Sequence, residues 1–105
     1  HLGETYNIGG NNEWANIDTV KLLCSIVDRL FQEDRSLATR FSASPCARSI
    51  PAASLIEFVT DRLGHDTRYA INAEKVMAEL GYRPVEVFES GLRKTVDWYL
   101  TYGGL

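Results

Sequence analysis

The stretch DRLGHDTRYAIN, residues 61–72, decides the fold, because it places a charged turn between a strand-like run and a helix start. It gathers two aspartates, two arginines and a histidine around Gly64. Glycine permits a positive φ angle or a close backbone approach. We expect such a loop to bind a polyanionic ligand. An ordinary solvated turn, whose arginines form surface ion pairs, is the alternative that the residues alone leave open.

The side chains of this loop have chemistry that suits a phosphate or a sugar. Arg62 and Arg68 offer planar guanidinium groups that match phosphate oxygens. His65 can donate a hydrogen bond to a phosphate or sugar oxygen, whether neutral or protonated. Asp61 can accept hydrogen bonds from hydroxyl groups or hold an arginine in place. The residues of the loop therefore indicate a site that binds a phosphate or a sugar.

Short elements are predicted on both sides of the loop. Residues 55–60, LIEFVT, are rich in β-branched and aromatic side chains and predict a strand. Residues 69–71 predict a brief extended piece, and Asn72 is a favourable N-cap for a helix over residues 73–80. Gly81 is expected to end that helix. The inward-facing side chains of the helix are predicted to be Val76, Met77 and Leu80.

Two longer helices are predicted from apolar residues at helical spacing. The first starts near Ile17 and Asp18, where the aspartate supplies an acid for the first turn. Its apolar stripe consists of Val20, Leu22, Leu23, Ile26, Val27, Leu30 and Phe31. The second covers residues 87–99, with a stripe of Phe88, Leu92, Val96, Tyr99 and Leu100. Gly91 within it costs about 1 kcal/mol relative to alanine and indicates close packing there.

The remaining segments show weaker patterns. Residues 5–8, TYNI, predict a short strand that the following two glycines end, and residues 11–16 predict a polar loop. Residues 32–54 lose all periodicity and contain two prolines, so we expect a long surface loop with one helical turn around residues 36–40. The expected fold class is α+β, helix-dominated with short strands. Residues 1–105 are expected to form a single domain.

Composition narrows the possible classes of protein. With 45% hydrophobic and 24% charged residues, the 105-residue chain is typical of one small globular domain or a piece of a larger one. Its net charge of −3 argues against nucleic acid as a general partner. Its apolar runs are too short to span a membrane. Cys24 is expected in the core and Cys46 in a loop; without a disulfide framework or metal-ligand spacing, we expect a cytoplasmic protein.

The motifs of a self-contained enzyme are missing from the sequence. No serine lies in a G-x-S-x-G pattern. The residues after Gly9 and Gly10 do not complete the dinucleotide-binding pattern G-x-G-x-x-G, and no tyrosine is followed four residues later by a lysine. The chain alone is therefore expected neither to bind NAD nor to catalyse a reaction.

The charged loop is similar to the DRPGHDRRYAIDA segment of the dTDP-glucose 4,6-dehydratases, which are extended short-chain dehydrogenases acting on nucleotide sugars. The resemblance covers most of the chain. GETYNIGGNNE at residues 3–13 resembles the family's GExYNIGGxNE, and Asn16 follows at the family's spacing. ELGYRP at residues 79–84 resembles ELGWxP, and FESGLRKTVDWYL at residues 88–100 resembles FExGIRKTVEWYL. The pairing of NE-x-x-N with DR-x-GHD-x-RYAI is the most specific part.

The resemblance implies the carboxy-terminal, substrate-binding region of an extended short-chain dehydrogenase, without the Rossmann half. The implied contacts with the dTDP-sugar, chiefly around its diphosphate, are Asn16, Asp61, Arg62, Leu63, Gly64 and His65. The catalytic residues and a tightly held NAD belong to the amino-terminal half of a homodimeric parent lyase, which converts dTDP-glucose to dTDP-4-keto-6-deoxyglucose. These 105 residues alone are therefore expected to be inactive.

The sequence departs from the family pattern at three positions. Leu63 stands where the family usually has proline, Asn72 where aspartate is usual, and Val87 where threonine often caps a helix. Two alternative functions stay open: a freestanding nucleotide-sugar-binding or interaction module, and part of a related nucleotide-sugar dehydratase or epimerase. For Trp14, a place beside the substrate cleft, an exposed position in the loop and an interdomain contact also all stay open.

Overall fold

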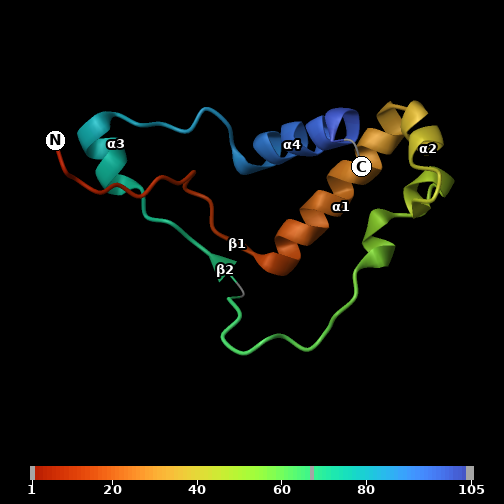
Figure 1. Cartoon of the computed structure of the whole chain (residues 1–105), viewed down its shortest axis with the longest axis horizontal. Helices are drawn as coiled ribbons and strands as arrows, with labels where there is room; N and C mark the ends of the chain where they lie inside the picture. The colour runs from red at the N-terminus through yellow and green to blue at the C-terminus, as the bar shows by residue number, and fades with distance from the viewer. Residues whose placement is uncertain (1, 67, 104–105) are drawn as a thin grey trace.

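The computed structural model describes residues 2–66 and 68–103 and has the helix-dominated α+β arrangement that the sequence predicts (Figure 1). The two strands are β1 (Trp14–Ala15) and β2 (Arg68–Tyr69). The α-helices are α1 (Asn16–Glu33), α2 (Ser36–Arg40), α3 (Glu74–Leu80) and α4 (Phe88–Tyr102). Two 3₁₀ helices, η1 (Pro45–Arg48) and η2 (Ala52–Leu55), follow α2. No helix in the described residues has the length and apolar character needed to cross a membrane.

The core lies along the carboxy-terminal half of α1, where α4 packs alongside it (Figure 1). The buried residues of this core are Ile26, Leu30, Phe31, Leu37, Cys46, Ala52 and Val96. The predicted stripe of α1 is therefore buried only in part. Its amino-terminal members Val20 and Leu23 remain 40% and 37% exposed, so that end of the helix has an open apolar face.

Residues 32–54 do not form the predicted surface loop. The helical turn expected around residues 36–40 is present as α2, but η1 and η2 follow it and fold back onto α1. The Asp28 carboxylate on α1 holds them there, because its Oδ1 accepts hydrogen bonds from the Ala52 amide at 2.8 Å and the Cys46 thiol at 3.5 Å. Cys46 is therefore buried in the core, and its assignment to a loop was wrong. Burial raises the pKa of its thiol.

Both strands predicted from local composition are absent. Residues 5–8 instead run along α3, where Lys75 donates to the Glu4 carboxylate at 2.7 Å and the Thr5 carbonyl at 3.1 Å. Residues 56–60 have no regular secondary structure. The one sheet in the described residues pairs β1 with β2 antiparallel, with Trp14 opposite Tyr69. The extended piece predicted near residue 69 is therefore present, shifted by one residue.

Helix α3 ends as its sequence predicts but begins one residue later than predicted. Its N-cap is Ala73, which has no capping side chain, so the assignment of the N-cap to Asn72 was wrong. Asn72 Oδ1 instead accepts a hydrogen bond from the Glu74 amide at 2.9 Å from just outside the helix. Gly81 ends the helix in the left-handed conformation, with φ of +69°. Val76 is buried as predicted, whereas Leu80 is 57% exposed and was wrongly assigned to an inner face.

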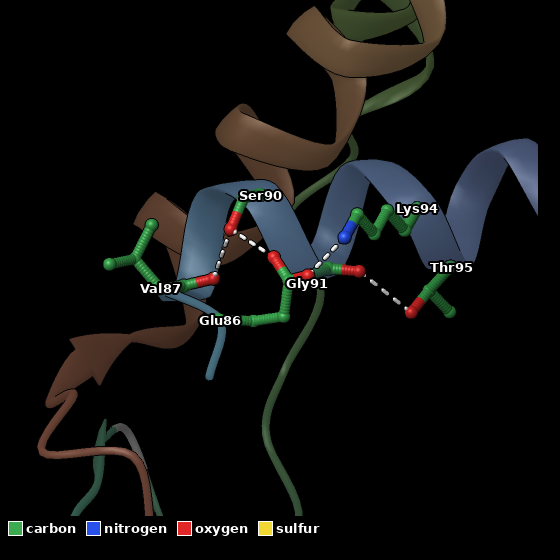
Figure 2. Close-up of polar contacts among 6 residues, drawn as sticks. All are labelled: Glu86, Val87, Ser90, Gly91, Lys94 and Thr95. Atoms are coloured by element: carbon green, nitrogen blue, oxygen red, sulfur yellow. Dashed lines mark hydrogen bonds and ion pairs between the residues drawn. The ribbon is translucent and has the colours of Figure 1, made fainter. Parts of the chain in front are cut away.

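Helix α4 begins without a capping side chain. Val87 occupies the N-cap position and makes no side-chain hydrogen bond, so the preceding Glu86 supplies the negative charge at this end (Figure 2). Glu86 accepts a hydrogen bond from Ser90 and forms an ion pair with Lys94, and these contacts lower its pKa. A Cβ on Gly91 would lie 3.5 Å from the Cβ of Glu86, an ordinary contact, so the predicted close packing is wrong. Tyr99 of the predicted stripe is likewise exposed.

The missing cap gives a stability prediction for Val87→Thr. A threonine hydroxyl at the N-cap can accept a hydrogen bond from a free amide of the first turn, so we expect a stabilisation of about 0.5–2 kcal/mol. The measurement is urea unfolding monitored by circular dichroism. Val85→Thr, at a position 97% exposed and outside the helix, is the matched control and should change stability little. Equal effects of the two changes would contradict the capping explanation.

A second prediction concerns the ion pair between Glu33 of α1 and Arg93 of α4. The hydrogen bond from Arg93 lowers the pKa of Glu33. The ion pair therefore stabilises the folded chain fully above the pKa that Glu33 has when unfolded, about 4.3. This stabilisation is lost as the pH falls through the lower pKa that Glu33 has in the folded chain. In urea titrations between pH 7 and pH 3, Glu33→Gln should flatten the acid decline in stability. Glu57→Gln, at an exposed carboxylate outside this ion pair, should leave the decline unchanged.

Candidate functional site

A pocket of about 570 Å³ lies between the amino-terminal end of α1 and the chain that leads into the charged loop. This volume is in the range of small-ligand sites. Its lining residues are Ala15, Asn16, Ile17, Val20, Leu55, Ile56, Glu57, Phe58, Val59, Asp61 and His65. The pocket therefore combines an apolar wall with a small set of polar groups, which is the usual composition of a ligand site.

Asn16, the first residue of α1, joins the helix to the charged loop. Its side-chain Nδ2 lies 3.2 Å from Nε2 of His65, 49 residues later, and donates to the Asp66 carbonyl at 2.9 Å. When Nε2 of His65 carries no proton, it accepts a hydrogen bond from Asn16 Nδ2 at this distance. The side-chain oxygen of Asn16 accepts no hydrogen bond from any described residue. It therefore remains available to a ligand or to water.

The start of α1 also contributes backbone donors. The first amides of a helix have no partner within the helix and carry partial positive charge. At α1 the N-cap is Ala15, which has no capping side chain, and residues 15–17 line the pocket. This end of the helix thus offers N–H groups to an anion.

A tight turn at residues 62–65 shapes the charged loop. The His65 amide donates to the Arg62 carbonyl at 3.3 Å, and Gly64 at the third position has φ of +74°. A positive φ at that position alone defines a type II turn, which requires glycine there. A Cβ on Gly64 would meet nothing within 4 Å, so the requirement is conformational and not steric. Leu63 occupies the second position and is 99% exposed.

The structure brings together some of the predicted site residues and separates others. Asn16, Asp61 and His65 line the same pocket. Arg62, Leu63 and Gly64 form the adjoining turn and do not line it. Arg62 has no ion-pair partner among the described residues, so its guanidinium group remains available for a ligand.

Arg68, expected to bind phosphate, lies on β2 with its Nε 3.8 Å from a Glu13 carboxylate oxygen. Trp14 packs against Phe88 of α4, with ring centroids 4.9 Å apart. Trp14 is half-buried in β1, so the exposed loop position is wrong, and the contact with Phe88 is one that the sequence did not predict.

The sequence did not reveal the apolar wall of the pocket. Val20 was assigned to the core stripe, and Phe58 and Val59 to a strand. In the sequence these residues differ from core residues in nothing but their place, because core residues also have apolar side chains.

Among the described residues, no group of three His, Cys, Asp or Glu side chains is placed to hold a metal ion. A second cavity, beside Asp28 and Cys46, has only about 160 Å³.

Comparison with known proteins tests the resemblance. The chain is 50% identical over 99 residues to a dTDP-glucose 4,6-dehydratase of Neisseria meningitidis serogroup B and 48% identical over 99 residues to one of Neisseria gonorrhoeae. It is 46% identical over 99 residues to dTDP-glucose 4,6-dehydratase 1 of Escherichia coli K12. The resemblance to the dTDP-glucose 4,6-dehydratases is confirmed. Each match covers 94% of this chain, and no family model matches the sequence.

The chain spans about a quarter of the length of these relatives, at 25%, 25% and 23%. About three-quarters of the length of each of these relatives therefore lies outside the matched region. The family's proline at the position of Leu63 now has a physical reason. Proline favours the second position of a type II turn, where its fixed φ matches the turn.

This turn yields a paired prediction. Leu63→Pro should stabilise the chain by about 0.4–1 kcal/mol, because it reduces the freedom of the unfolded chain at a compatible position. Gly64→Ala should destabilise it by about 1–2 kcal/mol, because alanine disfavours a positive φ. Both values come from chemical denaturation. Destabilisation by Leu63→Pro would show that residue 63 does not occupy the second position of a type II turn.

Proposed function

We propose that this chain is the carboxy-terminal, substrate-binding part of a dTDP-glucose 4,6-dehydratase and that the pocket beside α1 binds the dTDP-sugar. One observation carries the proposal. Asn16 lies far from Asp61 and His65 in the sequence, yet the three residues line a single pocket of ligand size. The identity of about half of the aligned residues to enzymes of that name supports the assignment of the substrate.

The chemistry of the pocket suits each part of a nucleotide sugar. The diphosphate would be held by the amides at the start of α1, by His65 and by the guanidinium group of Arg62. Asp61 would accept hydrogen bonds from sugar hydroxyls, since an ionised carboxylate is an acceptor only. The exposed apolar side chains of Val20 and Phe58 would cover the less polar faces of the ligand.

The resemblance implies NAD in the parent enzyme, but the described residues do not fit it. The candidate glycine turn at Gly9 and Gly10 leads into irregular chain and not directly into a helix start. Gly9 itself packs against Ile71, since a Cβ there would lie 3.0 Å from the Ile71 Cβ. NAD, the catalytic residues and the homodimer contacts would therefore belong to a Rossmann half elsewhere in a cytoplasmic parent protein. These 105 residues would supply substrate binding without turnover.

The test is the double variant Asp61→Ala/His65→Ala in the protein expressed from its complete reading frame. Loss of hydrogen bonds to charged groups, each worth about 1.5–3 kcal/mol, should weaken dTDP-glucose binding by about 10-fold or more. Isothermal titration calorimetry measures the affinity, and steady-state kinetics measures KM. Asp97→Ala, an exposed carboxylate on α4, is the matched control and should leave both unchanged. Unaltered affinity in the double variant would refute the site.

A further inference from the structure

Residues 56–60 have the composition of a strand but lack the pairing of one. Phe58 and Val59 are 82% and 75% exposed. Within the described part of the chain, no backbone N–H or C=O group of residues 57–60 forms a hydrogen bond. An exposed apolar segment with unpaired backbone groups is a ready template for pairing with another strand.

This unpaired segment is also one wall of the pocket. Every residue from 55 to 59 lines the pocket, opposite Asn16 and the first turns of α1. The Asn16 side is fixed by hydrogen bonds and by the helix. The wall is held at its start, where the Ile56 amide donates to the Ala53 carbonyl at 3.0 Å, but no described backbone hydrogen bond fixes residues 57–59. A ligand site with both sides held in place binds with less loss of entropy, so a partner for this segment would favour binding.

Residues 2–66 and 68–103 supply no backbone hydrogen-bond partner for residues 57–60. The radius of gyration of the chain is 17.6 Å, whereas a compact chain of this length has about 13 Å. In Figure 1 the segment between η2 and β2 runs along the outside of the molecule, away from α3 and α4. The sheet of β1 and β2 pairs two residues from each strand and does not reach residues 56–60.

Charge disfavours a second copy as the partner. Residues 55–61 carry Glu57 and Asp61 and no lysine or arginine. Self-pairing would bring four carboxylates together without a cation in the paired segments, and like charges across a sheet are destabilising. The relatives, in contrast, have about three-quarters of their length outside the matched region.

We infer that residues 56–60 form a strand by adding to the edge of a sheet in another part of the same polypeptide, beyond these 105 residues. Its backbone hydrogen bonds would fix the wall of the pocket, and the added sheet would cover part of Phe58 and Val59. The inference rests on the proposed function, because that function supplies the longer polypeptide. It adds the contact through which the rest of the protein would complete the sugar-nucleotide pocket.

The test is amide hydrogen exchange, followed by mass spectrometry, on the protein expressed from its complete reading frame. Without dTDP-glucose, the amides within residues 57–60 that pair should exchange about 100-fold or more slowly than in an unstructured peptide. Val59→Pro should remove this protection, because proline cannot donate to a ladder and distorts it. Leu63→Pro, in the adjoining turn, is the matched control and should keep it.

Amide hydrogen exchange of the wild-type protein tests the inference by itself, even if the Val59→Pro variant fails to fold. Unprotected exchange throughout residues 57–60 would overturn it, as would protection that appears only with dTDP-glucose or only at high protein concentration. A reading frame that encodes no further strands would also overturn it. Protection together with no affinity for dTDP-glucose would refute the proposed function and leave the strand pairing intact. The two failures are therefore distinguishable.

Discussion

Burial of one face of α1 is the constraint on which the rest of the structure depends. Ile26, Leu30 and Phe31 lie at helical spacing and are covered by α4 on one side and by residues 36–55 on the other. Each large apolar side chain contributes about 1.5–3 kcal/mol when fully buried, so this small core supplies most of the stabilisation available to the chain. Asp28, on the same helix, pairs with the Ala52 amide, which would otherwise be left unsatisfied near the core.

The residues of α1 that pack in the core and those that line the pocket lie at opposite ends of the helix. Its carboxy-terminal half is buried, and its amino-terminal end extends beyond the core to the pocket, where Asn16 holds the charged loop. A helix anchored at one end is a rigid support for polar groups at the other, and such support limits the entropy lost when a ligand binds. The same separation explains why Val20 and Leu23 belong to the apolar stripe yet remain exposed.

The sequence predicts features that depend on neighbours along the chain and fails where distant partners decide. The helices are recovered from periodicity, and the end of α3 from Gly81, because a helix bonds within itself. Asn16, Asp61 and His65 of the pocket are recovered from the charged loop and the resemblance, whereas Glu57, which also lines it, is missed. The packing of residues 32–54 on α1 is missed, because the buried residues Leu37, Cys46 and Ala52 have irregular spacing. The last two are also held by Asp28, which lies in another element.

The two failed strand predictions differ in physical cause. Residues 5–8 find polar partners on α3, so a local alternative replaces the sheet. Residues 57–60 find no backbone hydrogen-bond partner among the described residues, although the β-branched and aromatic composition of this segment favours a strand. Local preference and global structure agree in most of a natural fold, and disagreements concentrate at functional sites. Here the disagreement lies in the wall of the pocket that contains Asn16, Asp61 and His65. The conflict between composition and structure therefore supports the inferred strand pairing, in which a strand partner and the proposed ligand would both cover these residues.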